Sequence, residues 1–289
     1  MFESPQAAGA ALARVRYLAD QATATTVFLA ATLQKPLLVE GPAGVGKTQL
    51  AKAVAETTGA ELIRLQCYEG LDEARALYEW NYKKQLLRIQ ASAATGEGES
   101  WERTHDDIFT EEFLLTRPLL TAIRRSEPTV LLIDEADKTD VEVEALLLEV
   151  LSDFQVTIPE LGTVTATRRP FVVVTSNATR ELSEALKRRC LYLHLDYPAP
   201  ERERDIVLAQ VPDLELALAE ELARTAATLR SLELKKPPSV AETIDWARTL
   251  LALGVGTLDA AAIENTLGVV LKHHSDHARV AKELGLPAT

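Results

Sequence analysis

The pattern of apolar positions divides the chain into two parts. Up to about residue 195, short strand-like runs rich in apolar residues alternate with helical spacings, whereas only helical spacings follow. Such runs predict buried strands, here at residues 36–40, 61–66, 130–133, 171–176 and 191–195. Because strands that alternate with helices form parallel sheets, we predict an α/β fold with a parallel five-stranded sheet.

The last third of the chain has the amphipathic spacing of a small helical bundle. Prolines and glycines separate the predicted helices, which span residues 201–210, 214–232, 240–253 and 259–274. The segment 197–200 carries two alternating prolines and predicts a linker, because proline interrupts both helices and strand ladders. We therefore expect two domains, at residues 1–198 and 199–289.

The segment GPAGVGKT, residues 41–48, fits the phosphate-binding pattern G-x-x-x-x-G-K-[ST] between a predicted strand and a predicted helix at 49–56. Its glycines let backbone amides turn inward around phosphates, and the helix N-terminus adds partial positive charge. A chance glycine-rich turn is the alternative, and the flanking strand and helix argue against it. The candidate nucleotide-binding residues here are Gly41, Pro42, Ala43, Gly44, Val45, Gly46, Lys47, Thr48 and Gln49.

A second motif places two acids, Asp134 and Glu135, at the end of the apolar run 130–133. In open parallel sheets, ligands bind beyond the C-terminal strand ends. We expect Asp134 to hold Mg²⁺ together with Thr48, and Glu135 to polarise water, because consecutive strand residues point to opposite sides. Either motif alone would fit a solvated strand end or turn, but the two together favour a nucleoside triphosphatase.

Two further features lie after the acidic pair. Asn177 follows the strand 171–176, where an amide can position water or sense a γ-phosphate, although asparagine is also a common turn former. Arg188 and Arg189 end a short helix before the last strand. They are placed to reach a neighbour's nucleotide, where a transferred arginine accelerates phosphoryl transfer by about 10³ to 10⁵. The alternative is that they complement the helix dipole.

Composition limits the partners and the compartment. The 289 residues are 47% hydrophobic and 26% charged, which is typical of a globular enzyme. A net charge of −12 disfavours nucleic acid, although the pairs 83–84 and 168–169 could form a local basic stripe. Cys67 and Cys190 lie far apart and are expected to be reduced, and no signal peptide or membrane span is visible. We expect a cytoplasmic protein.

Taken together, GPAGVGKT, VLLIDEAD, the strand ending in Asn177, the arginine pair before Cys190 and the helical C-terminal part resemble an AAA+ ATPase. Within that superfamily the chain is similar to the MoxR branch, on an expected inserted hairpin near 155–167 (QVTIPELG at its start) and on the LYLHLDYP segment after Arg189. Segments 67–72, 77–82 and 242–247 look like the CoxD-type subgroup.

The resemblance implies a P-loop fold whose sheet is sandwiched by helices and followed by a small all-α lid. It also implies ATP hydrolysis with Mg²⁺, hexameric rings and chaperone activity, often with a von Willebrand factor A domain protein. CoxD-like members are linked to maturation of the metal centre of molybdenum-type CO dehydrogenase, so a client metalloenzyme is expected. The implied roles are Lys47 on the β- and γ-phosphates, Thr48 and Asp134 on Mg²⁺, Glu135 on water, Asn177 in sensing, and Arg189 as the trans finger with Arg188 in reserve.

One segment departs from the family pattern. Many AAA+ lids supply a second arginine to the nucleotide early in a lid helix, but residues 237–242 contain none. Arg248 lies further along the same helix and could substitute, although a surface role is favoured. The competing functions are a nucleic-acid motor of the clamp-loader or branch-migration kind and a non-hydrolysing switch, which the presence of Glu135 disfavours.

Three other patterns have competing interpretations. His273, His274 and His277 have metal-ligand spacing, but solvated histidines near a helix end are favoured. The aromatic residues of 78–82 could stack on bases, but packing or partner contact is favoured. The low-complexity segment 91–100 predicts a mobile loop.

Overall fold

The computed structural model describes residues 1–94 and 107–283. Its central sheet has the strand order β2-β5-β8-β1-β9, and all four pairings are parallel. These strands are β1 (Leu37–Glu40), β2 (Glu61–Gln66), β5 (Thr129–Asp134), β8 (Phe171–Ser176) and β9 (Leu191–His194). Each begins and ends within one residue of its predicted bounds, so the predicted α/β fold with a five-stranded parallel sheet is confirmed.

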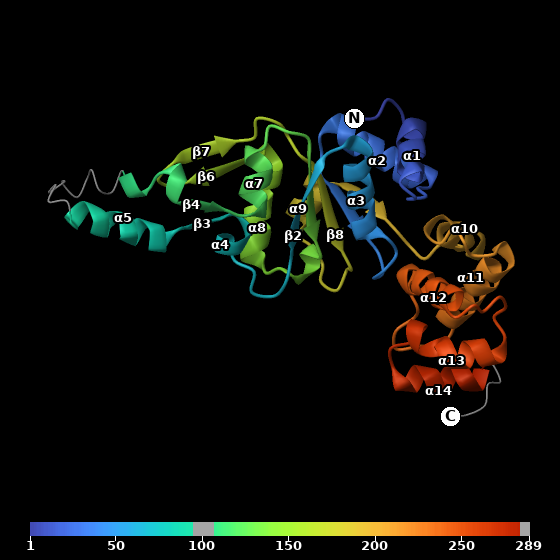
Figure 1. Cartoon of the computed structure of the whole chain (residues 1–289). Helices are drawn as coiled ribbons and strands as arrows, with labels where there is room; N and C mark the ends of the chain where they lie inside the picture. The colour runs from blue at the N-terminus through green and yellow to red at the C-terminus, as the bar shows by residue number, and fades with distance from the viewer. Residues whose placement is uncertain (95–106, 284–289) are drawn as a thin grey trace.

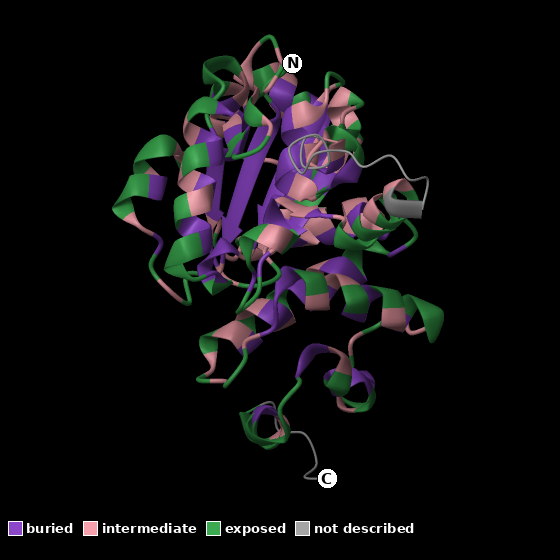
Figure 2. Ribbon diagram, turned by 90° about the vertical axis from the view of Figure 1, so that its left-hand side faces the viewer, coloured by how far each residue is buried: buried purple, intermediate pink, exposed green. Residues whose placement is uncertain are grey.

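Helices cover both faces of the sheet (Figure 1). One layer contains α1 (Pro5–Arg14), α2 (Gln21–Leu33) and α3 (Lys47–Thr58), and the other contains α7 (Pro118–Arg124), α8 (Val141–Asp153) and α9 (Glu184–Arg189). Alternate residues of β5 enter the two cores: Val130 and Leu132 face the first layer, and Leu131 and Ile133 face the second. Figure 2 shows the strands buried between the helices. Burial on both faces explains why the inner strands β5 and β8 contain continuous apolar runs.

Strand register brings the predicted chemistry to one edge of the sheet. Glu40 pairs with Ser176, so the loops that follow β1 and β8 leave the sheet side by side. Gln66 pairs with Asp134, so the ends of β2 and β5 lie level. The two sequence motifs therefore converge because parallel strands end at the same edge.

Two smaller units project from this core. β6 (Gln155–Ile158) and β7 (Gly162–Thr165) form an antiparallel hairpin, at the position of the segment expected to carry the inserted hairpin. A second unit was not predicted from the sequence and extends away from the sheet (Figure 1). It contains α4 (Glu73–Ala76), β3 (Tyr78–Trp80), α5 (Tyr82–Ala94), the short helix η1 (Glu111–Phe113) and β4 (Leu114–Thr116), with β3 antiparallel to β4.

The structure separates the aromatic residues of this second unit. Trp80 is buried and meets Tyr78 and Phe109 in edge-on contacts. Tyr82, by contrast, is 64% exposed at the start of α5. A single stacking platform for bases is therefore wrong, and packing accounts for Trp80. Residues 91–94 of the predicted mobile loop belong to α5, and residues 95–100 lie outside the described part of the chain.

The C-terminal part is helical, as predicted. It consists of α10 (Pro200–Gln210), α11 (Leu216–Ser231), α12 (Val240–Ala252), α13 (Ala260–Val270) and α14 (His274–Glu283), which share a hydrophobic core of their own. Trp246 lies fully buried in this core, and its indole N–H donates to Thr266 Oγ1 at 2.7 Å. Pro200 was expected in the linker but is the first residue of α10, because proline suits the first helical position.

The predicted helix at 259–274 is wrong at its C-terminal end. α13 ends at Val270 because Leu271 adopts an extended conformation, and α14 then begins at His274. Asp276, buried on α14, accepts hydrogen bonds from the amides of Lys235 and Lys236 and so fixes the new helix against the loop before α12. The turn between these two helices is set by that contact, which lies about 40 residues away in sequence.

The histidines around α14 do not assemble a metal site. His273 and His274 are exposed, and His277 Nε2 lies 3.1 Å from the carbonyl oxygen of Leu271. Within residues 1–94 and 107–283, no cluster of three or more histidines, cysteines or acids has the arrangement of a metal site. Asp276 accepts hydrogen bonds from two backbone amides.

Arg230 lies inside the group of helices α10 to α14, called the lid below, and contacts several of its parts. Its guanidinium makes two hydrogen bonds to the carboxylate of Glu203 and one to the carbonyl of Pro238 at 2.7 Å. The same group lies over the ring of Tyr197, 4.6 Å from its centre. One arginine thus joins α10, α11, the loop before α12 and the connection from the sheet.

None of the helices in the described residues has the length and apolar character needed to cross a membrane.

Candidate functional site

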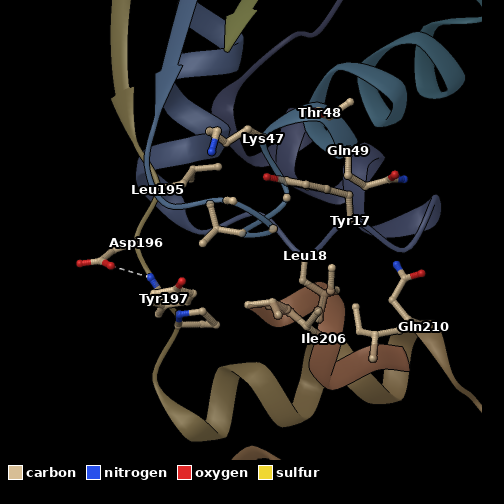
Figure 3. Close-up of a pocket in the computed structure, with 18 of the residues that line it drawn as sticks. Tyr17, Leu18, Lys47, Thr48, Gln49, Leu195, Asp196, Tyr197, Ile206 and Gln210 are labelled. Atoms are coloured by element: carbon tan, nitrogen blue, oxygen red, sulfur yellow. Dashed lines mark hydrogen bonds between the residues drawn. The ribbon is translucent and has the colours of Figure 1, made fainter. Parts of the chain in front are cut away.

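A cavity of about 680 Å³ lies between the C-terminal edge of the sheet and the lid. Residues 43–49 form one wall, and residues from the α1–α2 loop, α10 and α12 form the others. In Figure 3, Lys47 and Thr48 lie on the sheet side of this cavity, and Ile206 and Gln210 approach from α10. The cavity therefore meets both domains and contains the predicted phosphate loop.

The phosphate loop depends on glycine conformations. Gly41, Gly44 and Gly46 have φ of 151°, 75° and 100°, a region that other residues rarely adopt. A Cβ atom on Gly41 would lie 1.9 Å from the carbonyl oxygen of Leu195, so this position requires glycine. α3 begins directly after Gly46 with no side-chain cap, which leaves its first backbone amides free for an anion.

Lys47 is buried, and its ammonium group has three hydrogen-bond partners. Its ammonium group donates to the carbonyls of Gly41 at 2.6 Å and Pro42 at 2.7 Å, and to Asn177 Oδ1 at 2.8 Å. Burial lowers the pKa of Lys47, and the nearby carboxylates of Asp137 and Asp134 oppose that shift. Because an ammonium has three donors, Lys47 must exchange partners to contact a phosphate.

Asp134, at the end of β5, is almost completely buried and has three donors around it. Thr48 Oγ1 and Thr175 Oγ1 donate to Oδ1 at 2.9 and 2.6 Å, and Arg64 Nη2 donates to Oδ2 at 2.5 Å. A carboxylate beside a threonine hydroxyl is an oxygen set of the kind that Mg²⁺ prefers. Thr48 can keep its hydrogen bond to Asp134 while its own oxygen faces a metal. The predicted pair of metal residues is thus brought together, and the residues present fit that ion.

Glu135 differs from the expectation that two adjacent acids would alternate across the strand. β5 ends at Asp134, and Glu135 adopts a left-handed conformation with φ of 59°, so strand alternation does not apply to it. Its carboxylate accepts hydrogen bonds from Gln66 Nε2 at 3.0 Å and Asn177 Nδ2 at 3.4 Å, and it pairs with Lys138 at 2.8 Å. The backbone turn, rather than the pleat, gives the two acids separate partners.

Asn177 bridges the lysine and the second acid. Its Oδ1 accepts from Lys47 and its Nδ2 donates to Glu135. The loop that carries it is held by Asp137, which accepts from the amides of Asn177 and Thr179, both at 3.1 Å, and from the Thr179 hydroxyl. Burial, the largest influence, would raise the pKa of Asp137, but these hydrogen bonds hold it below its ordinary value of 3.8.

Arg188 and Arg189 lie on the surface at the end of α9, away from this cavity. Arg189 donates from Nε to Ser152 Oγ at 2.5 Å and from Nη1 to the carbonyl of Ala185 at 2.9 Å. Neither arginine is among the described residues that line the cavity. Upstream, Glu144 accepts from the amide of Ser183 at 2.6 Å and so fixes the start of α9. Both residues are therefore exposed at the end of a fixed helix, with the Arg189 guanidinium bonded to its own chain.

The lid reaches the phosphate loop through its backbone. The amide of Ala241, in the first turn of α12, donates to the carbonyl of Gly44 at 3.2 Å. Arg248 lies seven residues further along α12, which corresponds to about 10 Å of helix, and it pairs with the exposed Asp245 at 3.3 Å. Arg248 lines the cavity, but at a place displaced from the phosphate loop along the helix. The helix position nearest the loop carries no cation.

Several residues at this site were missed by the sequence analysis. Tyr17 and Leu18 line the cavity beside the loop, and α10 holds their segment through a hydrogen bond from Arg202 to the carbonyl of Leu18 at 3.0 Å. Burial raises the pKa of Tyr17. Arg64 and Gln66 of β2, Thr175 of β8 and Asp137 complete the surroundings of the two acids. The only available signal was strand periodicity, which places residues 64 and 66 on one face of β2.

Comparison with known proteins gives one family match. Residues 36–190 match the family described as AAA domain (dynein-related subfamily). The matched range contains the phosphate loop, the two acids, Asn177 and both surface arginines. It ends before the lid.

Individual relatives are distant. An uncharacterized protein of Staphylococcus aureus (strain bovine RF122 / ET3-1) is 28% identical over 172 residues, which are 57% of each chain. An uncharacterized protein of Staphylococcus haemolyticus is 25% identical over 228 residues, 76% of this chain and 77% of that protein. The ATP-dependent Clp protease ATP-binding subunit ClpL of Lactococcus lactis is 29% identical over 141 residues, 49% of this chain and 16% of ClpL. The chain thus spans 57% of the length of the first curated relative.

Proposed function

This chain belongs to the family described as AAA domain (dynein-related subfamily), and from that premise we propose that it is a Mg²⁺-dependent ATPase. The observation that carries the proposal is the meeting of Lys47, Asp134 and Asn177 at one end of the cavity. A nucleotide there would place its phosphates against the free amides at the start of α3, with Lys47 on the outer phosphates. Thr48 and Asp134 would hold Mg²⁺, and the bound ion would neutralise charge on the phosphates.

The chain's own residues also supply a candidate base. Glu135 lines the cavity and accepts a hydrogen bond from Asn177, so it is placed to accept a proton from water. The apolar walls formed by Tyr17, Leu18 and Ile206 support binding of the base moiety between sheet and lid. The name of the ClpL relative, an ATP-binding subunit, supports the same nucleotide.

The test of hydrolysis is the variant Glu135→Gln, which removes the base but keeps the size of the side chain. Single-turnover hydrolysis should fall by about 10² to 10⁴, while a fluorescent ATP analogue should still bind. If turnover stays unchanged, Glu135 is not the base. If the wild-type protein binds no nucleotide at any Mg²⁺ concentration, the ATPase proposal itself is wrong.

We also propose that Arg189 acts on the nucleotide of a neighbouring copy in a ring, with Arg188 as the reserve, because both are exposed at the end of α9 and neither lines the cavity of its own chain. Turnover per subunit should then rise with protein concentration as copies assemble. Arg189→Ala should lower turnover of assembled protein by about 10³ or more without changing nucleotide affinity. Turnover that persists after dilution has removed assembly would contradict a trans arginine.

The finer proposal is a MoxR-type, CoxD-like remodelling ATPase that works in the cytoplasm. Its supports are sequence resemblance and the β6–β7 hairpin at the expected position. A hexameric ring, a von Willebrand factor A domain partner and a client metalloenzyme such as a molybdenum-type CO dehydrogenase complete that proposal. Genes for such proteins beside this one would favour it. DNA-stimulated turnover that weakens with salt would instead favour a nucleic-acid motor.

A further inference from the structure

Arg64 is a charged residue at the site to which neither the family resemblance nor the sequence motifs give a role. It lies on β2, one of the two edge strands of the sheet, two residues before Gln66 and therefore on the same strand face as Gln66. Its guanidinium nitrogen Nη2 reaches Asp134 Oδ2 at 2.5 Å and also donates to Gln66 Oε1. The side chain of Asp134 is 3% exposed, whereas that of Arg64 is 48% exposed. A surface cation thus reaches a buried acid.

The contacts of the two Asp134 oxygens differ in kind. Oδ1 accepts from two neutral hydroxyls, those of Thr48 and Thr175. Oδ2 accepts from the charged Arg64. The carboxylate therefore has a positively charged partner, which occupies one of its two oxygens. Mg²⁺ at Thr48 and Asp134 would have to sit close to this guanidinium or replace it.

We propose that Arg64 is a resident counter-ion of Asp134 that opposes Mg²⁺ binding, so that metal-loaded nucleotide must displace its guanidinium. This inference rests on the proposed function, because it assigns a positioning residue to the same metal site. Displacement is feasible because β2 is an edge strand and nearly half of the Arg64 side chain already faces solvent. The guanidinium competes with Mg²⁺ for the same carboxylate, and like charges close together repel.

The same arginine links the metal acid to the candidate base. Gln66 accepts from Arg64 through Oε1 and donates through Nε2 to Glu135 at 3.0 Å. If Arg64 moves away from both residues, Gln66 loses the donor to its Oε1 and keeps the bonds that its Nε2 donates to Glu135 and to the carbonyl of Cys67. Movement of Arg64 would therefore loosen the restraint on Glu135 at the moment the metal arrives.

The experiment measures how strongly Mg²⁺ and nucleotide promote each other's binding. The dissociation constant of a fluorescent ATP analogue is determined with EDTA and with saturating Mg²⁺. The value with EDTA is divided by the value with Mg²⁺, and this ratio is compared between proteins. This ratio removes any effect that is the same for free and Mg²⁺-bound nucleotide. For Arg64→Gln we expect the ratio to rise about tenfold, because the competitor for Asp134 is gone.

Two variants provide controls. Arg64→Lys keeps the charge and should keep a ratio close to that of the wild type. Arg125→Gln breaks a comparable pair with Glu61 at the other end of β2, 2.7 Å in length, and should leave the ratio unchanged. An unchanged or lower ratio in Arg64→Gln would overturn the inference, because Arg64 would then merely orient Asp134. Absence of nucleotide binding by the wild type would overturn the proposed function as well, so the two failures are distinguishable.

Discussion

The carbonyl oxygen of Gly44 accepts a hydrogen bond from the backbone amide of Ala241, with 3.2 Å between oxygen and nitrogen. The phosphate loop and the lid are therefore joined at the point where a nucleotide's phosphates would lie. No side-chain charge takes part in this contact. In a lid whose corresponding segment lacks an arginine, a backbone contact at the start of α12 is the direct connection between the lid and the loop.

Replacing Gly44 by alanine should disturb this connection. A Cβ atom there would lie 2.4 Å from Ser239 Oγ, and the φ of 75° is itself unfavourable for alanine. We expect Gly44→Ala to weaken binding of a fluorescent ATP analogue about tenfold or more, equivalent to at least ~1.4 kcal/mol. Gly256→Ala is the control, because nothing lies within 4 Å of a Cβ at that position. Equal affinities in the two variants would show that the lid contact is unimportant for binding.

Asn177 should matter for turnover more than for binding, because it joins Lys47 to Glu135. Asn177→Ala removes the donor to the candidate base and is expected to lower kcat about 10²-fold, with little change in nucleotide affinity. Asn81→Ala serves as the control, since Asn81 caps α5 in the projecting unit through the amide of Lys84. Steady-state turnover and equilibrium binding, measured on the same samples, separate the two effects. A loss of affinity alone would remove Asn177 from the hydrolytic step.

Asp137 should make stability depend on pH in the acid range. Because its folded-state pKa lies below the ordinary value, its contribution to the free energy of unfolding is complete above about pH 4 and is lost as pH falls through the folded-state pKa. Asp137→Asn should reduce stability at neutral pH by about 1–3 kcal/mol and flatten the acid-side dependence. Denaturant unfolding, measured between about pH 3 and 7 in steps of about one pH unit, gives both the stability at neutral pH and its dependence on pH. If the free energy of unfolding of the variant depends on pH as steeply as that of the wild type, Asp137 is not the source of the dependence. The control is Asp213→Asn, which lies on an exposed turn of the lid.

The lid should depend on the buried pair of Arg230 and Glu203. Arg230→Met leaves the Glu203 carboxylate buried without its two guanidinium donors, which typically costs about 3–5 kcal/mol. Arg279→Met breaks the exposed pair with Glu233 in the same domain and should cost about 0–1 kcal/mol. Thermal unfolding of the full chain should therefore separate these two variants. Similar unfolding midpoints would show that the lid does not rely on Arg230.

The five strands of the central sheet were predictable, and the three-residue strands of the projecting unit were not. β5 and β8 are buried on both faces, so each has an apolar run of four residues that marks its position. β3 and β4, by contrast, have three residues each and pair across more than thirty residues of chain. Their pairing depends on contacts that no local pattern records. The break between α13 and α14 was missed for the same reason, because Asp276 meets amides from a distant loop.

The sequence by itself determined the phosphate loop, the acidic strand end and the sheet that carries them. Each of these is contiguous, so its chemistry follows from neighbouring residues: three glycines with positive φ and a lysine can form an anion cradle within one strand, loop and helix. Tertiary structure decided which groups meet across the sheet edge. Lys47 contacts Asn177 across 130 residues of sequence, and Arg64 contacts Asp134 across 70. Those pairings arise from strand order and register, which bring distant strand ends together, and a linear pattern of apolar positions does not specify them.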